Sequence, residues 1–587
     1  MLPAQVLPAH SFRLRALVVA ATAVTLSAGA GLVVSDSHAA APARAAERAG
    51  AQLPITTLEA EGAATDGAVL GPGYEQGSLE SEASGRSAVR LEPGRHLDFT
   101  VPVQANALTV AGNLPDGAEG TVAVFVNGRR LPAPLQVTSR FSYLDTPGIT
   151  GSTTHHFFDS ARMLLGGDLH PGDVVRLQPE TAAPYTVDLA DFEQVAAPPP
   201  QPPGSVSVTG TGADPTGAAD ASGAFTTAIQ QARSAGGQVW IPPGQYRIDS
   251  PLPVDGVSLR GAGAWHSVLH SSHLIDQTSS GGAVGLHDFA VLGSVTDRVD
   301  DSPDNAVTGS LGPGSAVTGL WLQHLKVGLW LTGDNTDLLV EGNRILDTTA
   351  DGINLNGSAQ RVRVRGNYLR NTGDDALAMW SLHAPDTASS FTGNTVIAPN
   401  LANGIAVYGG SDLTVADNLV ADTNALGSGI ALSNQSFGEP FFPLAGQLTV
   451  SGNRLVRAGA LNPNWGHAMG ALRVDAHDSP ITAQVRITDT TALESPHAVF
   501  EFVDGGGQGN STGEVVIDRA RIDHAGTFAF QAETAGSARV SNVVADSTGA
   551  AGVYNCPSGG AFDLQRGEGD SGWDSTWSQC GTWPQPR

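Results

Sequence analysis

The chain has 587 residues, of which 41% are hydrophobic and 72 are glycine, and its formal net charge is −26. This length exceeds one ordinary domain, so two or three domains are expected. The acidic balance argues against nucleic acid or an anionic membrane as partner, because neither is drawn to a negatively charged protein. The high glycine content is typical of a fold with many turns.

The N-terminus has the pattern of an export signal. Arg13 and Arg15 precede an apolar run over residues 17–34, and residues 37–40 (Ser-His-Ala-Ala) form a small-residue cleavage pattern. We therefore expect residues 1–40 to be a signal peptide that is removed. The prediction is a secreted, extracellular protein with no membrane anchor after cleavage.

Residues 55–195 consist of short alternating apolar segments separated by Gly and Pro turns. The clearest segments are residues 88–91, 96–101, 121–128, 174–177 and 185–189. Regular short strands without a convincing helix predict an antiparallel β-sandwich. The residues before position 55 are expected to be an unstructured leader. Residues 196–204 (Ala-Ala-Pro-Pro-Pro-Gln-Pro-Pro-Gly) are interpreted as a semi-rigid proline linker.

Residues 205–587 carry a repeat that predicts a right-handed parallel β-helix. One amphipathic helix over residues 224–235, followed by strands only, is the expected cap of the first coil. A turn asparagine or aspartate marks the repeat at Asn343, Asn367, Asn394, Asn418, Asn453, Asp489, Asp518 and Asn542. The first spacing, 24 residues (367 − 343), corresponds to one coil of three strands, and longer intervals hold inserted loops. The predicted fold class is therefore all-β.

An apolar ladder accompanies the repeat. Ile353, Leu377, Ile405 and Ile430 recur beside Gly, Asp or Asn and are expected to face the core on successive coils. The recurring asparagine needs no catalytic role, because asparagine suits the left-handed conformation of a turn and hydrogen-bonds its stacked counterparts.

Three aspartates fall at matching positions of two neighbouring coils. Asp351 and Asp375 each lie eight residues beyond a repeat asparagine, and Asp374 directly precedes the second. Stacked strands are about 4.8 Å apart, so the three carboxylates are expected to meet at the surface. Their repulsion raises the pKa of at least one, and cleavage of a glycosidic bond requires a carboxylic acid together with a carboxylate.

These aspartates can also be interpreted as structural turn residues without a catalytic role, since turn aspartates are common in glycine-rich solenoids. Successive strand residues point to opposite faces, so Asp374 and Asp375 share a cleft only if the chain bends. Gly373, directly before them, permits such a bend.

Aromatic and polar residues extend the same surface. Trp380 and Tyr408 lie 13 and 14 residues beyond the asparagines of their coils (380 − 367, 408 − 394) and predict a sugar platform, although packed core aromatics are equally common. Asn354, three residues after Asp351, is assigned to substrate binding. Trp465 lies in a long insertion between coils, where a cleft wall is expected.

Acidic residues gather over residues 297–305, and Asp297 is assigned to a substrate-binding rim of the cleft. Oxygen ligands of this run could bind calcium, but the run lacks a loop-type calcium signature. A solvated loop or a rim of the cleft is therefore favoured, and we predict no metal site and no cofactor. The two cysteines, Cys556 and Cys580, lie near the C-terminus of a chain expected in an oxidising compartment. They predict a disulfide that staples the C-terminal tail.

Several of these segments together resemble glycoside hydrolase family 87, the α-1,3-glucanases and mycodextranases. The likeness covers about residues 55–587 and is carried by residues 295–300, 323–328, 351–354, 371–381 and 405–410. Two departures fall near the expected cleft: Leu355-Asn356-Gly357 replaces a segment with histidine, and Arg473 lies in place of a more aromatic stretch.

The resemblance implies a secreted, inverting endo-hydrolase of α-1,3-glucosidic linkages in α-1,3-glucan or nigeran, with Asp351, Asp374 and Asp375 as the catalytic trio. By analogy with polygalacturonases, it implies that Asp374 is the acid and that the other two activate water. It also implies a sandwich similar to a carbohydrate-binding module. The expected partner is the α-glucan substrate, and the expected state is a monomer.

Two other classes of function fit the same pattern. One is a polysaccharide lyase or polygalacturonase-type enzyme that degrades pectin. The other is a non-catalytic carbohydrate-binding β-helix in which the carboxylates are structural. A lyase of pectin would need calcium and a basic group near the uronate, whereas a binding protein would release no reducing ends.

Overall fold

The computed structural model describes residues 49–142, 157–278, 281–462, 467–578 and 580. All of them belong to one compact unit of the chain. The predicted signal peptide and Trp465 lie outside the described residues. In the part that is described, no helix combines the length and the apolar character needed to pass through a bilayer.

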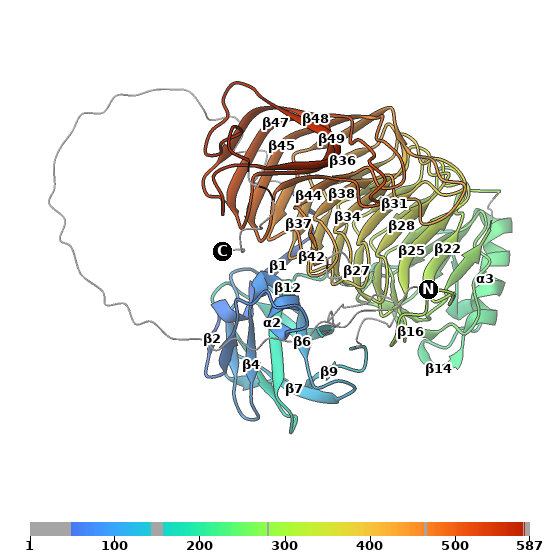
Figure 1. Ribbon diagram of the computed structural model, residues 1–587. Coiled ribbons are helices and arrows are strands. Elements are labelled where there is room, and N and C mark those ends of the chain that lie inside the picture. The colour runs from blue at the N-terminus through green and yellow to red at the C-terminus, as the bar shows by residue number, and fades with distance from the viewer. Residues whose placement is uncertain (1–48, 143–156, 279–280, 463–466, 579, 581–587) are drawn as a thin grey trace, which may run out of the picture. The chain divides into compact units, whose positions relative to one another are not determined.

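Two antiparallel sheets precede the solenoid (Figure 1). The first consists of β10 (Asp159–Leu169), β6 (Ala105–Asn113), β12 (Tyr185–Glu193), β4 (Ala88–Leu91), β3 (Ala68–Leu70) and β1 (Ile55–Glu59). The second consists of β2 (Ala64–Thr65), β5 (Leu97–Thr100), β11 (Val174–Pro179), β7 (Glu119–Val126), β8 (Arg129–Arg130) and β9 (Leu135–Thr138). Phe99 of one sheet meets Phe192 of the other edge-on, with ring centroids 6.1 Å apart. The predicted strand segments coincide with β4, β5, β7, β11 and β12.

Most of the remaining strands pair in parallel, each with the strand one coil further along, as a parallel β-helix requires. Two small sheets lie apart from them, the parallel pair β35 (Gly410–Ser411) and β39 (Leu444–Ala445) and the antiparallel pair β42 (Leu461–Asn462) and β43 (His467–Ala468). One face is built from β13 (Val206–Ser207), β15 (Gln238–Ile241), β17 (Ser258–Gly261), β20 (Gly285–His287), β23 (Ala316–Thr318), β26 (Leu339–Glu341), β29 (Arg363–Arg365), β32 (Ser390–Thr392), β36 (Thr414–Ala416) and β40 (Gln447–Ser451). A second is built from β14 (Thr216–Asp220), β16 (Gly244–Arg247), β18 (Ser267–His270), β21 (Ala290–Leu292), β24 (Trp321–Gln323), β27 (Arg344–Thr348), β30 (Tyr368–Thr372), β33 (Thr395–Ile397), β37 (Leu419–Ala421) and β41 (Arg454–Val456).

The third face, called here the site face, runs beneath the candidate active site. Its strands are β19 (Ile275–Gln277), β22 (Asn305–Gly309), β25 (Val327–Thr332), β28 (Ile353–Asn356), β31 (Leu377–Trp380), β34 (Ile405–Tyr408), β38 (Ile430–Ser433), β44 (Leu472–Asp475) and β46 (Phe500–Val503). The last coils are completed by longer strands, β45 (Gln484–Ser495), β47 (Glu514–Ala525), β48 (Phe530–Ala545) and β49 (Tyr554–Arg566).

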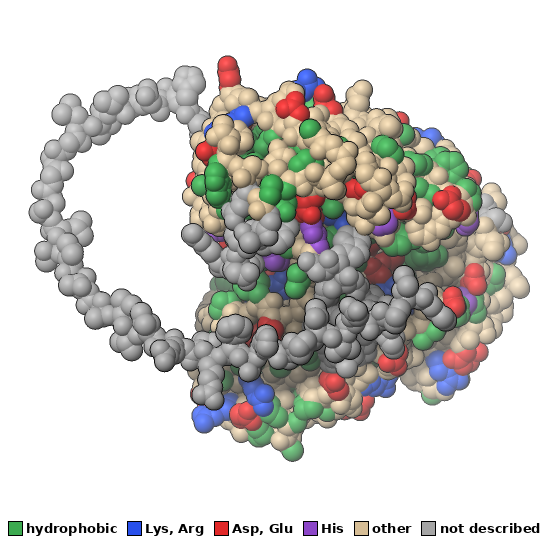
Figure 2. Space-filling model, viewed as in Figure 1, with side chains coloured by type: hydrophobic (Ala, Val, Ile, Leu, Met, Phe, Trp, Pro, Cys, Tyr) green, Lys and Arg blue, Asp and Glu red, His purple; other side chains and the backbone are tan. Residues whose placement is uncertain are grey.

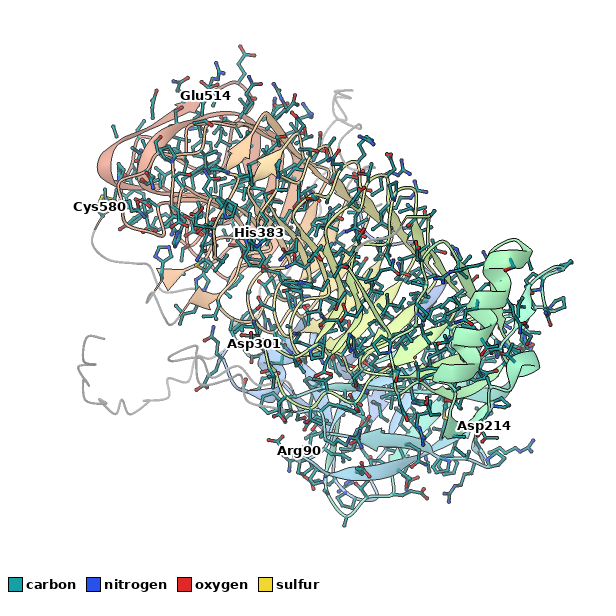
Figure 3. The ribbon with its side chains drawn as sticks, turned by 90° about the vertical axis from the view of Figure 1, so that its right-hand side faces the viewer. Arg90, Asp214, Asp301, His383, Glu514 and Cys580 are labelled. Carbon is teal, nitrogen blue, oxygen red and sulfur yellow. A yellow bond between two sulfur atoms is a disulfide. The ribbon has the colours of Figure 1, made fainter. Side chains whose placement is uncertain are left out.

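Helix α3 (Ser222–Ala235) packs on the first coil, close to the predicted helix over residues 224–235. Its apolar side, including Phe225, Ala228 and Ile229, is fully buried, which removes the open end of the core from water. Asp214 marks this end of the solenoid in Figure 3, and Glu514 and Cys580 mark the other.

The predicted repeat asparagines form a buried ladder. Each Nδ2 donates to Oδ1 of the asparagine one coil further along, from Asn343 to Asn367 at 2.9 Å, then to Asn394 at 2.9 Å, and on to Asn418 and Asn453 at 3.0 Å each. All five side chains are 0% exposed. A buried amide is costly unless bonded, so the stack stabilises the turn of every coil it crosses.

The ladder ends before the last coils. At the next repeat positions, Asp489 pairs with Arg519, and Asn542 donates to Asp518 near the surface. The predicted apolar ladder is present in register: Ile353 faces Leu377, Leu377 faces Ile405, and Ile405 faces Ile430. All of its side chains are buried in the solenoid core.

The end of the expected leader is ordered, so that prediction is wrong for its last residues. Gly50 is buried and donates its N–H to the carbonyl of Asp417 at 2.8 Å. Ala51 N donates to Thr395 Oγ1 at 2.8 Å. The chain therefore lies on the solenoid before it enters β1.

The first antiparallel sheet and the 3₁₀ turn Ser84–Arg86, which precedes its strand β4, are hydrogen-bonded to the solenoid. Arg86 Nη2 donates to the carbonyl of Thr423 at 2.6 Å, and Ser160 N donates to Asp347 Oδ2 at 3.1 Å. Arg370, on β30, donates to Ser160 Oγ at 3.0 Å. Strand β30 leads directly into the candidate site. These contacts therefore hold in place the coil that carries the site.

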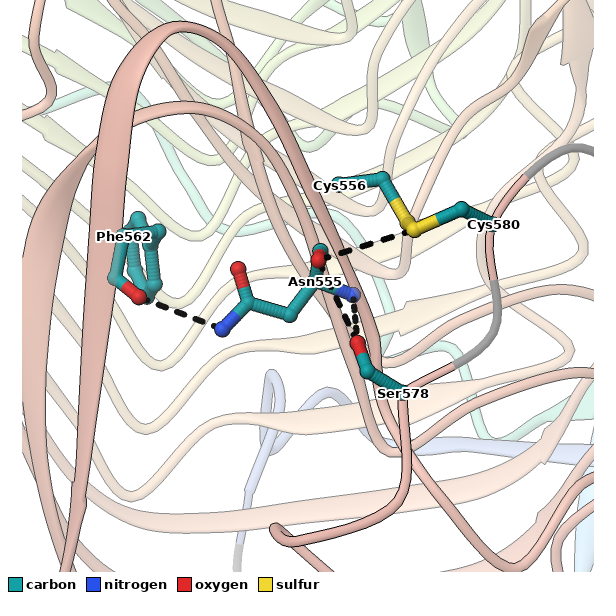
Figure 4. The surroundings of a disulfide bond; sticks show 5 residues. All are labelled: Asn555, Cys556, Phe562, Ser578 and Cys580. Carbon is teal, nitrogen blue, oxygen red and sulfur yellow. Dashed lines mark hydrogen bonds between the residues drawn. A yellow bond between two sulfur atoms is a disulfide. The ribbon is translucent and has the colours of Figure 1, made fainter.

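The two cysteines form a disulfide at the end of the chain, with Cα atoms 5.7 Å apart (Figure 4). Asn555, next to Cys556, hydrogen-bonds Ser578 through both its backbone N and O at 3.2 Å. The bond thus ties the segment after β49 back to that strand.

Acidic and basic side chains are interspersed on the face of the molecule drawn in Figure 2.

Candidate active site

Three aspartates meet where two neighbouring coils turn onto the site face. Asp351 lies in the turn between β27 and β28, and Asp374 and Asp375 lie in the equivalent turn between β30 and β31. The two turns are hydrogen-bonded to each other, because Gly373 N donates to Ala350 O and Gly352 N donates to Asp375 O, both at 3.2 Å.

Close stacking of the two turns depends on Gly352. A Cβ atom there would lie 2.5 Å from the carbonyl oxygen of Ala376 and 2.4 Å from Leu369 Cδ2. No side chain fits such a gap without displacing backbone. The glycine that follows Asp351 thereby lets the next turn bring its own aspartates alongside.

Asp374 and Asp375 share one cavity because they lie in a turn, where the strict alternation of strand residues does not apply. Asp375 N donates to Asp374 Oδ1 at 2.9 Å, and Thr372 Oγ1 donates to the carbonyl of Asp374 at 3.1 Å. These local bonds fix the bend that the sequence, with Gly373 at this point, permits.

The three carboxylates form a tight cluster. One oxygen from each of Asp351, Asp374 and Asp375 lies within 4.8 Å of the other two. Asp351 and Asp375 are 7% and 5% exposed, whereas the side chain of Asp374 is 24% exposed. They line a cavity of about 790 Å³, with Asp374 the most accessible of the three.

Burial and mutual repulsion favour protonation of this cluster. Burial raises the pKa of Asp351 well above its usual range, and the charges of Asp374 and Asp375 raise it further. Burial and Asp374 raise the pKa of Asp375 to about 7, against hydrogen bonds from Asn403 that lower it. The cluster therefore holds a proton close to neutral pH, as an acid–base catalyst requires.

A cation compensates the exposed member. Arg298 Nη2 lies 2.7 Å from Asp374 Oδ2, and the same guanidinium is 2.7 Å from Asp300. The charge of Asp374 raises the pKa of Arg298. Arg298 lies in the loop between β21 and β22, whose Asp301 is labelled in Figure 3.

Aromatic side chains form one wall of the cavity. Trp380 and Tyr408 lie in register on adjacent strands, and both contact Phe437, at centroid distances of 6.2 and 5.1 Å. Trp330 meets Trp380 edge-on at 6.3 Å. The indole Nε1 of Trp380 donates to Ser436 O at 2.7 Å, which fixes the orientation of its ring.

Of the other predicted site residues, the structure places Asn354 in the cavity but not Asp297. Asn354 lines the cavity and donates to Asp351 Oδ2 at 2.8 Å, while its Oδ1 is buried without a protein partner. Asp297 is exposed and does not line the cavity, so its assignment to the rim is not supported, and its neighbour Arg298 takes that place. Trp465 lies outside the described residues.

Sequence reasoning missed Asn403, Lys326, Trp330 and Phe437, all of which line the cavity. Arg473, which was expected near the cleft, lines the cavity as well. For Asn403 a signal was present. Asp351, Asp375 and Asn403 each lie two residues before a member of the apolar ladder, so they occupy equivalent positions on three coils.

Two further clusters in the described part of the chain bring potential metal-ligating atoms together: Asp159 with His324 and Asp347, and His467 with Glu501 and Glu533. In the first, His324 Nε2 lies 2.6 Å from Asp159, and Asp347 accepts hydrogen bonds from Gln323 and Asn371. Internal bonds therefore already use these atoms.

A second cavity, of about 650 Å³, is lined by the linker and by Trp240, Trp265 and Trp321. Its charged groups are paired, as Arg344 with Glu193 at 2.7 Å and Arg260 with Asp288 at 2.7 Å. It holds no cluster of carboxylates, so the aspartate cavity is the better candidate for chemistry.

Comparisons with known proteins match both parts of the chain. Residues 52–195 match the family model for α-1,3-glucanase catalytic domain D1, and residues 219–460 match that for domain D2. The chain is 62% identical to the catalytic unit of a thermostable GH87 α-1,3-glucanase from Streptomyces thermodiastaticus strain HF3-3, with a TM-score of 0.90 over 92% of this chain and 100% of that one.

More distant structures share the fold. A GH87 α-1,3-glucanase catalytic domain in complex with tetrasaccharides is 23% identical, with a TM-score of 0.76 over 89% of this chain and 100% of that one. Another, in complex with nigerose, is 24% identical, with a TM-score of 0.75 over 89% and 99%. No curated protein matches the chain.

Proposed function

Since the chain belongs to the GH87 α-1,3-glucanases and is a glycoside hydrolase, we propose that it cleaves α-1,3-glucosidic bonds within α-1,3-glucan or nigeran, with inversion. Asp351, Asp374 and Asp375 are the proposed catalytic groups. The observation that carries the proposal is the gathering of these three carboxylates within 4.8 Å in one cavity.

In the proposed reaction Asp374 is the acid, since it is the most accessible of the three. It gives a proton to the glycosidic oxygen while a water attacks the anomeric carbon from the opposite face. Asp351 and Asp375 hold that water and receive its proton. A water bonded at about 2.8 Å to two oxygens spans up to about 5.6 Å between them, so separations within 4.8 Å are suitable.

The proton of the cluster needs a route to Asp374. In the substrate-free protein Asp374 is paired with Arg298, whereas burial favours protonation of Asp351 and Asp375. The acid role of Asp374 therefore requires a proton to move to it from a neighbouring carboxyl when substrate enters. A shift of this kind is short, because the donor and acceptor oxygens belong to one cluster.

The stereochemical outcome is a separate part of the proposal. Inverting enzymes with two carboxylates keep them about 6.5–9.5 Å apart, and retaining enzymes about 5–5.5 Å. Here a third carboxylate shares the site. Asp351 and Asp375 hold the water, whereas the glycosidic bond lies between Asp374 and that water. The configuration of the first product, followed by NMR before mutarotation, decides between the two: the α-anomer signifies retention and the β-anomer inversion.

The proposed substrate fits the cavity wall. The faces and edges of Trp380, Tyr408 and Trp330 suit the apolar faces of a neutral sugar ring. The complexes of relatives with nigerose and tetrasaccharides support an oligosaccharide chain as ligand. Export of the enzyme remains part of the proposal, supported by the signal pattern over residues 1–40.

The test is reducing-sugar release from insoluble α-1,3-glucan, nigeran, dextran and polygalacturonate in parallel. Wild type, Asp375→Asn and the control Asp337→Asn are compared. Asp337 is an exposed aspartate paired with Arg361, outside the cavity. We expect release from one or both of the first two substrates, lost in Asp375→Asn and retained in the control.

Two results would contradict the proposal. Activity of Asp375→Asn equal to that of wild type would remove the trio from the mechanism. Release from polygalacturonate alone, with new ultraviolet absorbance and loss of activity in a chelator, would indicate a lyase instead.

A further inference from the structure

Arg298 makes more contacts with the candidate site than a cleft-lining residue needs. Besides Asp374 and Asp300, its guanidinium approaches the carbonyl of Gly373 at 3.4 Å, so it contacts both the side chain of the proposed acid and the backbone before it. Its side chain is only 18% exposed. A guanidinium held at several points has a fixed direction, and so does the carboxylate paired with it.

The loop that carries Arg298 is itself held by Lys326, the one lysine of the chain. Lys326 Nζ donates to the carbonyls of Asp300, at 2.7 Å, and of Ser302. Lys326 N also donates to Asp304 O at 2.7 Å. The side chain therefore spans the loop between β21 and β22 and closes it onto the start of β25.

The same lysine is bonded to the catalytic turn. Ala350 N donates to Lys326 O at 2.8 Å, and Ala350 directly precedes Asp351. Lys326 thus contacts the loop of Arg298 on one side and the turn of Asp351 on the other. A displacement of either segment is transmitted to the other through one residue.

We infer that Arg298 is a positioning residue for Asp374 and that Lys326, through the loop it closes, fixes Arg298 in that role. The inference rests on the proposed function, because it assumes that Asp374 acts in glycosidic cleavage. Arg298 and Lys326 thus orient the carboxylates of the site and do not bind the sugar. A mere loop anchor would leave the protonation of the cluster unchanged.

The charge of Arg298 has a definite effect on the cluster. The charged and titratable groups around Asp374 are Asp351 and Asp375 from the two turns, Tyr408 from β34, Arg473 from β44, Lys326 before β25, and Arg298 with Asp300 from the loop. Arg298 is the cation paired with Asp374 among them. Arg298 lowers the pKa of Asp351, so removal of its charge lets the cluster as a whole hold a proton to higher pH.

The experiment compares kcat, KM and the pH dependence of kcat/KM for wild type, Arg298→Gln, Arg298→Lys and Lys326→Met. In Arg298→Gln we expect kcat to fall about 100-fold, as for loss of one oriented donor, and KM to change far less. Both limbs of the pH profile should move to higher pH by about one unit. Arg298→Lys retains the charge, so the limbs of its pH profile stay in place. It loses the several contacts of the guanidinium, so its kcat falls.

Lys326→Met keeps Arg298 but releases the loop. We expect kcat to fall about tenfold, since a small misplacement of a catalytic group is costly, with the pH limbs unchanged. The matched control is Arg361→Gln, which removes an arginine from an Arg–Asp pair outside the cavity. It should leave kcat, KM and both limbs as in wild type.

The inference is overturned if Arg298→Gln, folded by circular dichroism, keeps wild-type kcat and unchanged pH limbs. It is also overturned if Arg298→Lys moves the limbs as far as Arg298→Gln. Failure of the proposed function is recognised separately, as wild type without glucanase activity. In that case the aspartate carboxyls of wild type and Arg298→Gln are titrated by ¹³C NMR, which needs no substrate. Higher carboxyl pKa values in Arg298→Gln support the inference, and unchanged values overturn it.

Discussion

Asn403 donates two hydrogen bonds to one oxygen of Asp375, from its backbone N and from its side-chain Nδ2, each at 2.8 Å. The two residues occupy equivalent turns of adjacent coils. The carboxylate of one coil is therefore oriented by the amide of the next, and the solenoid repeat itself provides the partner. Asn403 Nδ2 also donates to Tyr408 Oη at 3.0 Å, which joins this pair to the aromatic wall.

Removal of this amide should impair catalysis. Asn403→Ala deletes a donor to a charged acceptor, an interaction that contributes about 1.5–3 kcal/mol. We expect kcat/KM on α-1,3-glucan to fall about 10- to 100-fold, with the acidic limb of its pH profile at higher pH because Asp375 holds its proton longer. The measurement is the pH dependence of kcat/KM. An unchanged profile would show that the Asn403 side chain does not control Asp375.

Asp375 should destabilise the fold at neutral and alkaline pH. Its pKa is raised from an ordinary value near 4 to about 7 in the folded protein. Between these values the native state binds more protons than the unfolded state, so stability falls as pH rises through this window. Below it, the protonated group carries no such penalty.

We therefore expect Asp375→Asn to be more stable than wild type at pH 8, by an amount of the order of a few kcal/mol, and not at pH 4.5. Denaturant unfolding at the two pH values measures this. Equal stability differences at both pH values would mean that ionisation of Asp375 costs the fold nothing.

Trp380 should contribute to binding more than to the chemical step. Its ring lines the cavity, and its indole N–H is already bonded to Ser436 O. Loss of an aromatic stacking surface costs about 1–3 kcal/mol where the stacked ligand is a nucleic-acid base. Trp380→Ala is expected to raise KM for soluble oligosaccharides about tenfold and to change kcat less. A fall confined to kcat would place the ring in the mechanism instead.

The asparagine ladder should be a principal source of stability. Asn394 donates from Nδ2 to Asn418 Oδ1 and Val364 O, and its Oδ1 accepts from both amides of Asn367. Asn394→Ala leaves several buried partners unsatisfied, each at about 1–3 kcal/mol. We expect a loss of roughly 3 kcal/mol or more in denaturant unfolding.

The matched control for the ladder is Asn542→Gly, because Asn542 has a φ of 54°, a left-handed conformation that strains alanine but not glycine. Asn542 occupies the last repeat position, and its bond to Asp518 lies near the surface. Its loss should cost less than about 1 kcal/mol, as expected for an exposed hydrogen bond. If both variants were equally destabilised, burial of the ladder would not be the source of its effect.

The features that could be predicted from the sequence alone are periodic ones. The spacing from Asn343 to Asn367 predicted the coil, and the coil placed Asp351 beside Asp375 because residues one repeat apart stack. The apolar ladder from Ile353 to Leu377 followed from the same rule. The resemblance to the α-1,3-glucanases depended on residues 351–354, 371–381 and 405–410 of these coils and, in addition, on residues 295–300 and 323–328.

The partners that inserted loops supply to the site are visible only in the folded protein. Arg298 lies 76 residues before Asp374 (374 − 298), in a loop that no repeat governs, so neither spacing nor periodicity relates the two. The sequence pointed to Asp297, one position away, because acidity is visible in a sequence whereas the direction of a loop side chain is not. The contacts of Lys326, and the hydrogen bonds that Ser160 of the sandwich donates to Asp347 and accepts from Arg370, are of the same kind. A repeat fixes what stacks on itself, whereas the approach of an inserted loop depends on the packing of the whole chain.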